Sequence, residues 1–376
     1  MDAAPFYLDH NGTTPVAAEV VVAMWPYLTE HFGNPSSTTP LGRKAKDAIE
    51  AAREQVATLI GAHPEEITFT SGGTESNNLA IRGTATLAAQ RVAVTSTVEH
   101  PATAEPLALL EADAWRVHRL PVDAEGRVAT DRVPAGPIGL GTLILAQNET
   151  GTIQPVAKIA ERVHSAGGVM HTDAAQAVGK IPVAVDDLGV DLLSIAGHKL
   201  YAPKGVGALY VRRGTPIGPL LVGAGQERGL RPGTENVASI VGLGKAAELA
   251  LGLLATEPAR QATLREDLWR QLSDGIPGLT RVSPLHNCLP NTLMVALPGR
   301  LGADLLDAAP AIAASTGSAC HSGVHTPSAT LLAMGIEPGL ALGALRLTLG
   351  RSTTNAHIDQ AATAIVQTWS NSARTT

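Results

Sequence analysis

Apolar runs of strand length alternate with helical stretches between residues about 15 and 255, and this alternation limits the possible folds more than any other feature. It favours an α/β fold with a mostly parallel sheet flanked by helices. Apolar residues at helical spacing predict a helix over 41–60, which Gly61 would end. We expect strands at 67–70, 92–95, 143–146, 169–172, 192–195 and 208–211.

The spacing of the apolar runs changes after residue 255, which indicates a second folding unit. A chain of 376 residues is longer than one typical domain and can bury two cores. Aromatic residues make up only 3% of the chain, so these cores must consist mainly of Ala, Val, Leu and Ile. We expect strands at 291–297 and 344–349 and helices at 303–308 and 356–369.

A lysine and an aspartate stand at the ends of two predicted strands. Lys199 follows the apolar run 191–196, and Asp173 follows the run 169–172. Open α/β sheets bind ligands at the carboxyl ends of their strands, so we expect both side chains at one site. There a lysine can form a Schiff base with an aldehyde cofactor, and an aspartate can pair with a pyridinium nitrogen. The pair therefore indicates a site for pyridoxal 5'-phosphate (PLP).

Simpler interpretations of the same residues stay open at this point. Lys199 could be a solvated loop lysine, and Asp173 could cap a helix. A metal-dependent hydrolase could use His171, Asp173 and His198, but Lys199 would then have no function. We therefore expect no metal site.

A glycine-rich turn lies between the predicted strand 67–70 and a helical stretch. Ser71-Gly-Gly-Thr74 could form an anion cradle from backbone N–H groups and the helix dipole. A glycine pair alone is weak evidence, because such pairs mark any tight turn. His100 precedes a proline and another helical stretch, where it could stack on a flat ring or serve as an ordinary loop histidine.

These residues belong to motifs that run through nearly the whole chain. Together the motifs resemble the cysteine desulfurase and selenocysteine lyase family of PLP enzymes. The motifs are Tyr7-Leu-Asp-His-Asn-Gly-Thr-Thr-Pro15, Gly33-Asn-Pro-Ser-Ser37, Phe69-Thr-Ser-Gly-Gly-Thr-Glu-Ser-Asn-Asn78, Gln147-Asn-Glu-Thr-Gly151, His171-Thr-Asp-Ala-Ala-Gln176, Ala196-Gly-His-Lys199, Gln226-Glu-Arg-Gly229, Arg231-Pro-Gly-Thr-Glu-Asn236 and Ser315-Thr-Gly-Ser-Ala-Cys320.

The resemblance implies the PLP-dependent transferase fold of type I. Residues 15–255 would form a large domain around a mostly parallel, seven-stranded sheet flanked by helices. Residues 1–14 and 256–376 would form a smaller α+β domain, which carries the loop of the catalytic cysteine. We also expect a homodimer, because the resemblance implies that a threonine of one subunit serves the site of the other.

The resemblance also implies which residues hold the cofactor. Lys199 would hold PLP and carry protons as a catalytic residue, and Asp173 would bind the pyridine nitrogen. Gln176 would bind the ring hydroxyl, while His100, also catalytic, would stack on the ring. The remaining cofactor contacts would come from Gly73, Thr74, Asn148 and His198, with Thr234 reaching the phosphate from the partner subunit.

The resemblance assigns substrate binding and sulfur transfer to another group of residues. Asn148 and Arg346 would hold the substrate carboxylate, which the planar fork of an arginine matches bidentately. Cys320 would be the nucleophile that takes sulfur from L-cysteine as a persulfide, leaving L-alanine. Cys288, the other cysteine of the chain, lies in no matching motif and is expected to be structural.

The chain departs from the family pattern at several positions. Ala196 stands where many desulfurases have a serine that donates to the phosphate, and Gly12 stands where alanine is common. Ala196 and the sequence around His321 are also similar to selenocysteine lyases. The substrate could therefore be L-selenocysteine instead of L-cysteine. An aminotransferase on the same fold and a catalytically silent scaffold protein are more remote alternatives.

Net charge and cysteine content indicate the surroundings in which the protein works. The formal net charge is −6 without a basic tract, which argues against nucleic acid or an anionic membrane as partner. Two cysteines in 376 residues fit a reducing compartment. We expect a cytoplasmic protein that passes sulfur to an acceptor, such as an iron–sulfur scaffold protein or a thiolation enzyme.

Overall fold

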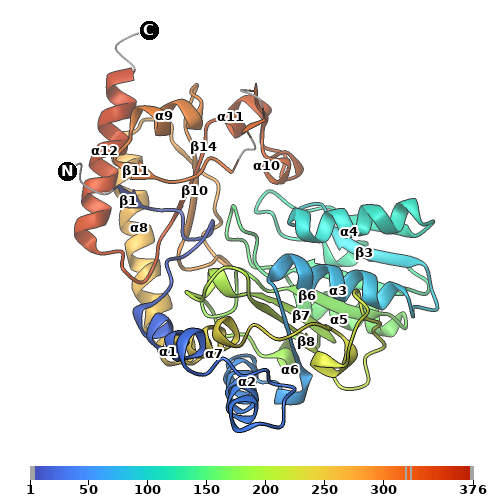
Figure 1. Cartoon of the computed structure of the whole chain (residues 1–376). Helices are drawn as coiled ribbons and strands as arrows, with labels where there is room; N and C mark the ends of the chain where they lie inside the picture. Colours follow the sequence, from blue (N-terminus) through green and yellow to red (C-terminus); the bar gives the residue numbers. More distant parts are fainter. Residues whose placement is uncertain (1–4, 318–319, 322–323, 373–376) are drawn as a thin grey trace.

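A seven-stranded sheet forms the centre of the larger part of the molecule (Figure 1). The computed structural model describes residues 5–317, 320–321 and 324–372. All neighbouring strands run parallel except β8, which is antiparallel to both of its neighbours. The mostly parallel seven-stranded sheet is thus confirmed. Its order is β2 (Ile67–Thr70), β8 (Gly207–Val211), β7 (Leu192–Ala196), β6 (Val169–Asp173), β5 (Leu140–Ile144), β3 (Val92–Ser96) and β4 (Arg116–Leu120).

The sequence placed five of these strands to within one residue and erred on two. We expected a strand at 143–146, whereas β5 spans Leu140–Ile144. Gly141 reads as a turn signal, yet it lies in the strand because a Cβ there would meet Val163 Cγ2 at 2.5 Å. The strand β4 was not expected, since it is an edge strand of mostly polar residues that stays partly exposed.

Helices cover both faces of this sheet, and strands such as β5 and β7 are accordingly buried at every position. On β7, Leu193 packs with α2, α5 and α7, whereas its neighbour Leu192 packs with α3 on the other face. The expected helix over 41–60 is α2, which Thr39 caps by accepting from the Gly42 N–H and which Gly61 ends at φ 68°. The helices are α1 (Ala18–Thr29), α2 (Pro40–Ile60), α3 (Gly73–Ala85), α4 (Pro101–Ala112), α5 (Val156–Ser165), α6 (Val185–Leu188) and α7 (Val237–Leu253).

The elements from the last third of the chain lie beside the large sheet (Figure 1), and they pack around a second hydrophobic core. Its antiparallel sheet has the order β14-β10-β9, and the N-terminal strand β1 pairs in parallel with β11. All four elements expected after residue 255 are present, with ends shifted by up to three residues. The strands are β1 (Phe6–Tyr7), β9 (Thr280–Arg281), β10 (Thr292–Ala296), β11 (Ile312–Ala313), β12 (Cys320–His321), β13 (Val324–His325) and β14 (Ala344–Thr348), and the helices are α8 (Glu257–Gly275), α9 (Gly302–Ala308), α10 (Ala329–Ala333), α11 (Pro338–Leu342) and α12 (Asn355–Ser372).

Among the described residues, no single helix has the length and apolar composition to cross a membrane. The consecutive helices α7 and α8 would meet both criteria only if taken together, and they are bent by 75° at the break between them.

Candidate active site

A cavity of about 410 Å³ opens at the carboxyl ends of the central strands. Ile144, Asp173 and Ala196, the last residues of β5, β6 and β7, line it, as expected for an open α/β sheet. It also brings together nine of the eleven residues that the sequence singled out for catalysis or binding. These nine are Gly73, Thr74, His100, Asn148, Asp173, Gln176, His198, Lys199 and Arg346.

Lys199 reaches the cavity from a single 3₁₀ turn that follows β7. Its Nζ donates to the carbonyl oxygens of Asn11 and Gly12, each at 2.6 Å. Burial and, to a lesser extent, the nearby Arg346 lower the pKa of Lys199 to about 8, although Asp9 and Asp173 act in the opposite direction. A lysine with such a pKa is partly neutral near physiological pH, which is the form that attacks an aldehyde.

Asp173 ends β6 with its carboxylate held from two directions. Oδ2 accepts from Asn77 Nδ2 at 2.7 Å, and Oδ1 accepts from the Ala175 N–H at 3.0 Å. Asn77 is itself fixed, because it also donates to Thr103 Oγ1 at 3.1 Å. The carboxylate therefore faces the cavity in one orientation, suited to a cationic ring nitrogen.

The glycine-rich turn between β2 and α3 contributes Gly73 and Thr74 to the wall of the cavity. Gly72 has φ 149°, a conformation that favours glycine, and α3 begins at the next residue. A Cβ at Gly73 would lie 3.2 Å from the Cβ of Ala196, so a larger residue would crowd this wall. Because Gly73 and Thr74 are the first residues of α3, the unpaired N–H groups of this helix end are available to an anion in the cavity.

Two histidines at the cavity are held in defined orientations. His100 caps α4, with its Nδ1 accepting from the Ala102 N–H at 3.1 Å, so the neutral ring carries its proton on Nε2. Loss of solvation lowers the pKa of His100 below the usual value. His198 Nδ1 lies 3.0 Å from Thr13 Oγ1, and burial lowers its pKa to about 4. His198 is accordingly neutral at physiological pH, able to donate a hydrogen bond without adding charge.

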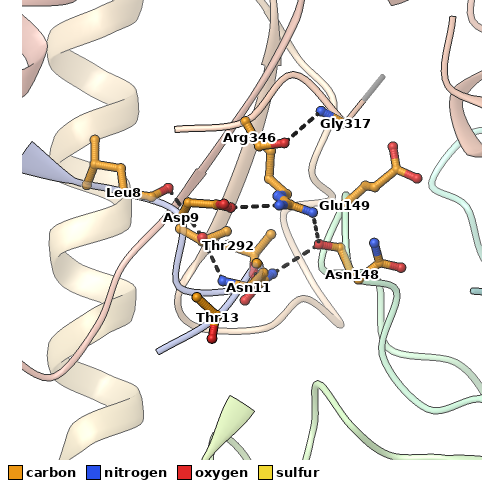
Figure 2. A network of polar contacts seen from close by, with 12 residues as sticks. Leu8, Asp9, Asn11, Thr13, Asn148, Glu149, Thr292, Gly317 and Arg346 are labelled. Atoms are coloured by element: carbon orange, nitrogen blue, oxygen red, sulfur yellow. Dashed lines mark hydrogen bonds and ion pairs between the residues drawn. The ribbon is translucent and has the colours of Figure 1, made fainter. Parts of the chain in front are cut away.

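A hydrogen-bonded cluster that the sequence did not predict supports Gln176 and Lys199 from behind. Lys180 Nζ donates to Gln176 Oε1 at 2.6 Å and to Asn11 Oδ1 at 2.8 Å. The Asn11 carbonyl oxygen accepts from Gln176 Nε2 at 3.0 Å and also from Lys199. Asn11 is 1% exposed and donates through Nδ2 to the Asn148 carbonyl oxygen and to Thr292 Oγ1. It thereby joins the cavity to the smaller sheet (Figure 2).

Arg346 enters the cavity from β14 of the smaller sheet, and its side chain is only 9% exposed. Its Nη2 lies 2.6 Å from Asp9 Oδ1, and its Nη1 donates to the Asn148 carbonyl oxygen at 3.4 Å (Figure 2). The sequence predicted the position of Arg346 at the site but not its pairing with Asp9.

Glu99 is a further titratable residue behind the cavity that the sequence did not single out. Glu99 as a whole is half-buried, and its carboxyl group is the buried part of the residue. It accepts from Ser96 Oγ at 2.5 Å and from the Ile144 N–H at 3.0 Å. Burial, together with the charge of Asp173, raises the pKa of Glu99 to about 8, although the hydrogen bonds from Ser96 and Ile144 act in the opposite direction.

The remaining predicted residues lie elsewhere or outside the described part. Thr234 is exposed on the loop before α7 and is not among the residues that line the cavity. The backbone of Cys320 lies in β12, which pairs with β13, but its side chain is outside the described residues. Cys288 is half-buried, and burial raises the pKa of its thiol.

The residues proposed for the metal alternative do not form a cluster. His171 is buried in β6, with its ring nitrogens bonded to Thr142 Oγ1 and Ser194 Oγ. In the part of the chain that the structure describes, no group of three or more His, Cys, Asp or Glu side chains is arranged to hold a metal ion.

The residues present fit PLP. The cavity volume lies within the usual range of small-molecule sites. A lysine of lowered pKa, an oriented aspartate and the N-terminus of α3, where a Cβ at Gly73 would lie within 3.2 Å of Ala196, line one cavity. These features define a PLP-dependent enzyme of fold type I.

Comparison with known proteins leads to the same class. The aminotransferase class-V family model matches residues 6–361, so the chain belongs to this family. It is 46% identical to a cysteine desulfurase of Trichormus azollae over 362 residues, which cover 94% of this chain and 90% of the relative. It is 43% identical to the cysteine desulfurase NifS of Azotobacter vinelandii, over 95% of this chain and 90% of that one. The solved structure of a NifS-like protein superimposes with a TM-score of 0.91 at 35% identity, covering 97% of this chain and 99% of the other.

Proposed function

We propose that the protein is a PLP-dependent cysteine desulfurase, in which the thiol of Cys320 takes the sulfur atom of L-cysteine. The products are L-alanine and a persulfide on Cys320, so the atoms balance without an added oxidant or reductant. The observation that carries this proposal is the meeting of Lys199, Asp173 and Arg346 in one cavity. A PLP enzyme that acts on an amino acid needs three groups: a lysine that the substrate amine can replace on the cofactor, a partner for the ring nitrogen and an anchor for the substrate carboxylate. Lys199, Asp173 and Arg346 supply these groups in that order.

Lys199 would hold the cofactor and then move a proton at the substrate Cα. PLP, when bound, draws electrons away from that carbon and so makes its proton removable. Asp173 would keep the pyridine nitrogen protonated. His100 would lie against the ring, and Gln176 would donate to the ring hydroxyl. The N-terminus of α3 with Gly73 and Thr74, together with His198, would hold the phosphate.

Arg346 and Asn148 would orient the substrate through its carboxylate. The segment that leads to Cys320 starts beside Arg346, because Ser315 pairs with Arg346 through hydrogen bonds in both directions. A segment anchored there can bring the Cys320 thiolate to the sulfur of a substrate that Arg346 holds.

We further propose that the protein works as a homodimer. Thr234 is exposed and lies outside its own cavity, so it is free to serve the site of a partner. It precedes α7, and α7 packs against α1. Large apolar side chains of α1 and the segment after it are exposed, which favours burial against a second copy. These are Val21, Val22, Trp25, Leu28 and Phe32.

The finer assignments belong to the same proposal. The large domain would comprise residues 15–255, and the smaller domain residues 1–14 and 256–376, in line with the separate packing of α7 and α8. The persulfide sulfur would pass to an acceptor in the cytoplasm, such as an iron–sulfur scaffold protein or a thiolation enzyme. L-selenocysteine is the alternative substrate, because Ala196 stands where selenocysteine lyases also tend to lack the serine of many desulfurases.

The deciding experiment compares L-alanine formation from L-cysteine and from L-selenocysteine by the PLP-loaded protein. We expect alanine from L-cysteine with one persulfide on Cys320, which mass spectrometry of the intact protein detects. Cys320→Ala should retain PLP but lose the persulfide and the cysteine reaction. Cys288→Ala is the matched control and should keep both. Alanine from L-selenocysteine alone would identify a selenocysteine lyase, and full turnover of L-cysteine by Cys320→Ala would refute the role of Cys320.

A further inference from the structure

Asp9 forms the shortest contact that any described residue makes with the Arg346 guanidinium. The Asp9 Oδ1 to Arg346 Nη2 distance is 2.6 Å (Figure 2). The Asp9 backbone is also fixed, because its carbonyl oxygen accepts from Tyr7 Oη at 3.1 Å and from the Gly12 N–H at 2.9 Å. The carboxylate consequently starts from a rigid turn and points at the side chain proposed to anchor the substrate.

The missing side chain of Gly12 gives the Asp9 carboxylate its space. A Cβ at Gly12 would lie 2.2 Å from Asp9 Oδ2 and 2.8 Å from Asp9 Cγ, which is closer than atoms can approach. The carboxylate is the far end of a flexible side chain, so an alanine at position 12 would displace it instead of unfolding the turn. Gly12 thus permits the present position of Asp9 beside Arg346.

The nitrogen atoms of the Arg346 guanidinium differ in how closely other described residues contact them. A guanidinium has five N–H donors. Nη2 contacts Asp9, Nη1 reaches the Asn148 carbonyl oxygen at only 3.4 Å, and Nε is buried without a hydrogen-bond partner among the described residues. The fork therefore keeps free donors for an arriving carboxylate, but a carboxylate of the protein already occupies one nitrogen.

We propose that Asp9, admitted by Gly12, is a positioning residue that orients Arg346 and also sets how tightly the site holds a substrate carboxylate. This inference rests on the proposed function, because it takes Arg346 as the carboxylate anchor. A substrate carboxylate must share one guanidinium with Asp9, so two negative charges come close together beside a side chain that is only 9% exposed. Asp9 therefore improves orientation and weakens affinity at the same time.

The test separates these two effects with an amide. Asp9→Asn keeps an oxygen that can accept from Arg346 Nη2 but removes the negative charge. The probe is 3-mercaptopropionate, which has a carboxylate and a thiol but no amine that could react with the cofactor. We expect calorimetry with the PLP-loaded protein to show roughly tenfold tighter binding to Asp9→Asn, as for removal of a nearby like charge. The affinity for 3-mercapto-1-propanol, which lacks the carboxylate, should not change.

A second variant tests the part played by Gly12. Gly12→Ala should change the affinity for 3-mercaptopropionate in the same direction as Asp9→Ala, because both remove the carboxylate from Arg346. The double variant Asp9→Ala/Gly12→Ala should then have the same affinity for 3-mercaptopropionate as Asp9→Ala, since no Asp9 carboxylate is left to displace. Gly252→Ala is the matched control, because a Cβ at this exposed position of α7 meets nothing within 4 Å.

Turnover of L-cysteine on the same preparations separates a failure of this inference from a failure of the proposed function. Asp9→Asn should lower KM for L-cysteine by a larger factor than it changes kcat, the pattern of an effect mainly on binding. Normal alanine formation together with unchanged or weaker 3-mercaptopropionate binding by Asp9→Asn would overturn the role of Asp9 alone. No alanine from any preparation, with tighter binding by Asp9→Asn, would overturn the desulfurase and leave the role of Asp9 standing.

Discussion

Lys180 donates to Gln176 Oε1 at 2.6 Å, and this contact determines which end of the Gln176 amide faces the cavity. With Oε1 occupied, the amide can offer only Nε2, and one of its two protons already goes to the Asn11 carbonyl oxygen. The remaining N–H is available to the cavity that Gln176 lines. Gln176 is thus prepared to donate to an oxygen such as the ring hydroxyl of PLP.

The first prediction is that Lys180→Met loosens the cofactor. Without Lys180 the Gln176 amide can turn, and loss of one well-oriented hydrogen bond should weaken PLP binding roughly fivefold. The absorption maximum of the bound cofactor should shift as well, which a purely structural role of Lys180 would not cause. Fluorescence titration and visible spectra measure both, with the exposed Lys158→Met as control. Identical affinity and spectrum would contradict the assignment.

The same variant should change how stability depends on pH. Burial lowers the pKa of Lys180 well below 10.5, and the charges of Lys199 and Arg346 add to this effect. The unfolded chain therefore binds a proton that the folded protein excludes, so the free energy of unfolding should rise as pH increases toward 10.5. Urea unfolding at a series of pH values should show a smaller rise for Lys180→Met than for the wild type. An equal slope would mean that Lys180 is protonated in the folded protein.

Capture of PLP by the apo-protein should follow the titration of Lys199. Its pKa of about 8 predicts that the rate increases with pH and levels off above pH 8, well below the 10.5 of an ordinary lysine. The charged groups that set this value are Arg346 on β14, Asp9 on the N-terminal segment and Asp173 on β6. Stopped-flow absorbance measures the rate. A midpoint near 10 would show that the Lys199 amine is not desolvated.

The sequence predicted the position of Lys199 and Asp173 well because both follow continuous apolar runs that are typical of buried parallel strands. The strands β6 and β7 end where expected to within one residue, and the topology then brings their ends together. The expected strand at 143–146 left out Gly141, which lies in β5 where Val163 of α5 packs against it. A local sequence pattern therefore predicts the position of a strand best when the strand consists only of residues selected for burial.

The supporting residues of the site could not be predicted in the same way. Asn11, Lys180 and Asp9 act through partners that are up to 337 positions away in the chain. No periodic pattern marks such contacts, because they arise only when the N-terminal segment passes between the two sheets. Asp9 and Asn11 lie in the motif 7–15, which does not reveal the partner of either residue, and Lys180 lies in no motif at all.

Glu99 should make the protein less stable as pH rises. Its pKa of about 8 lies above the usual 4.5, so the folded protein keeps a proton that the unfolded chain loses between these values. This contribution to stability is full below pH 4.5 and is lost as pH rises through about 8. Glu99→Gln stays neutral and can still accept from the Ile144 N–H, so its unfolding free energy should fall less between pH 5 and 8. Denaturant titrations measure this, and parallel curves for both proteins would contradict the raised pKa.

Ala196→Ser should bind PLP more tightly than the wild type. Ala196 ends β7 against Gly73, so a serine hydroxyl there would lie beside the N–H groups of α3 and could donate to the same phosphate. One hydrogen bond to a charged group should lower the Kd for PLP by roughly tenfold. Ala196→Val is the control, since it fills the space without a donor and should bind PLP no better than the wild type. Equal affinity of Ala196→Ser and Ala196→Val, measured by fluorescence titration, would place the phosphate away from this wall. Tighter binding by the serine variant alone would locate the phosphate between Gly73 and Ala196.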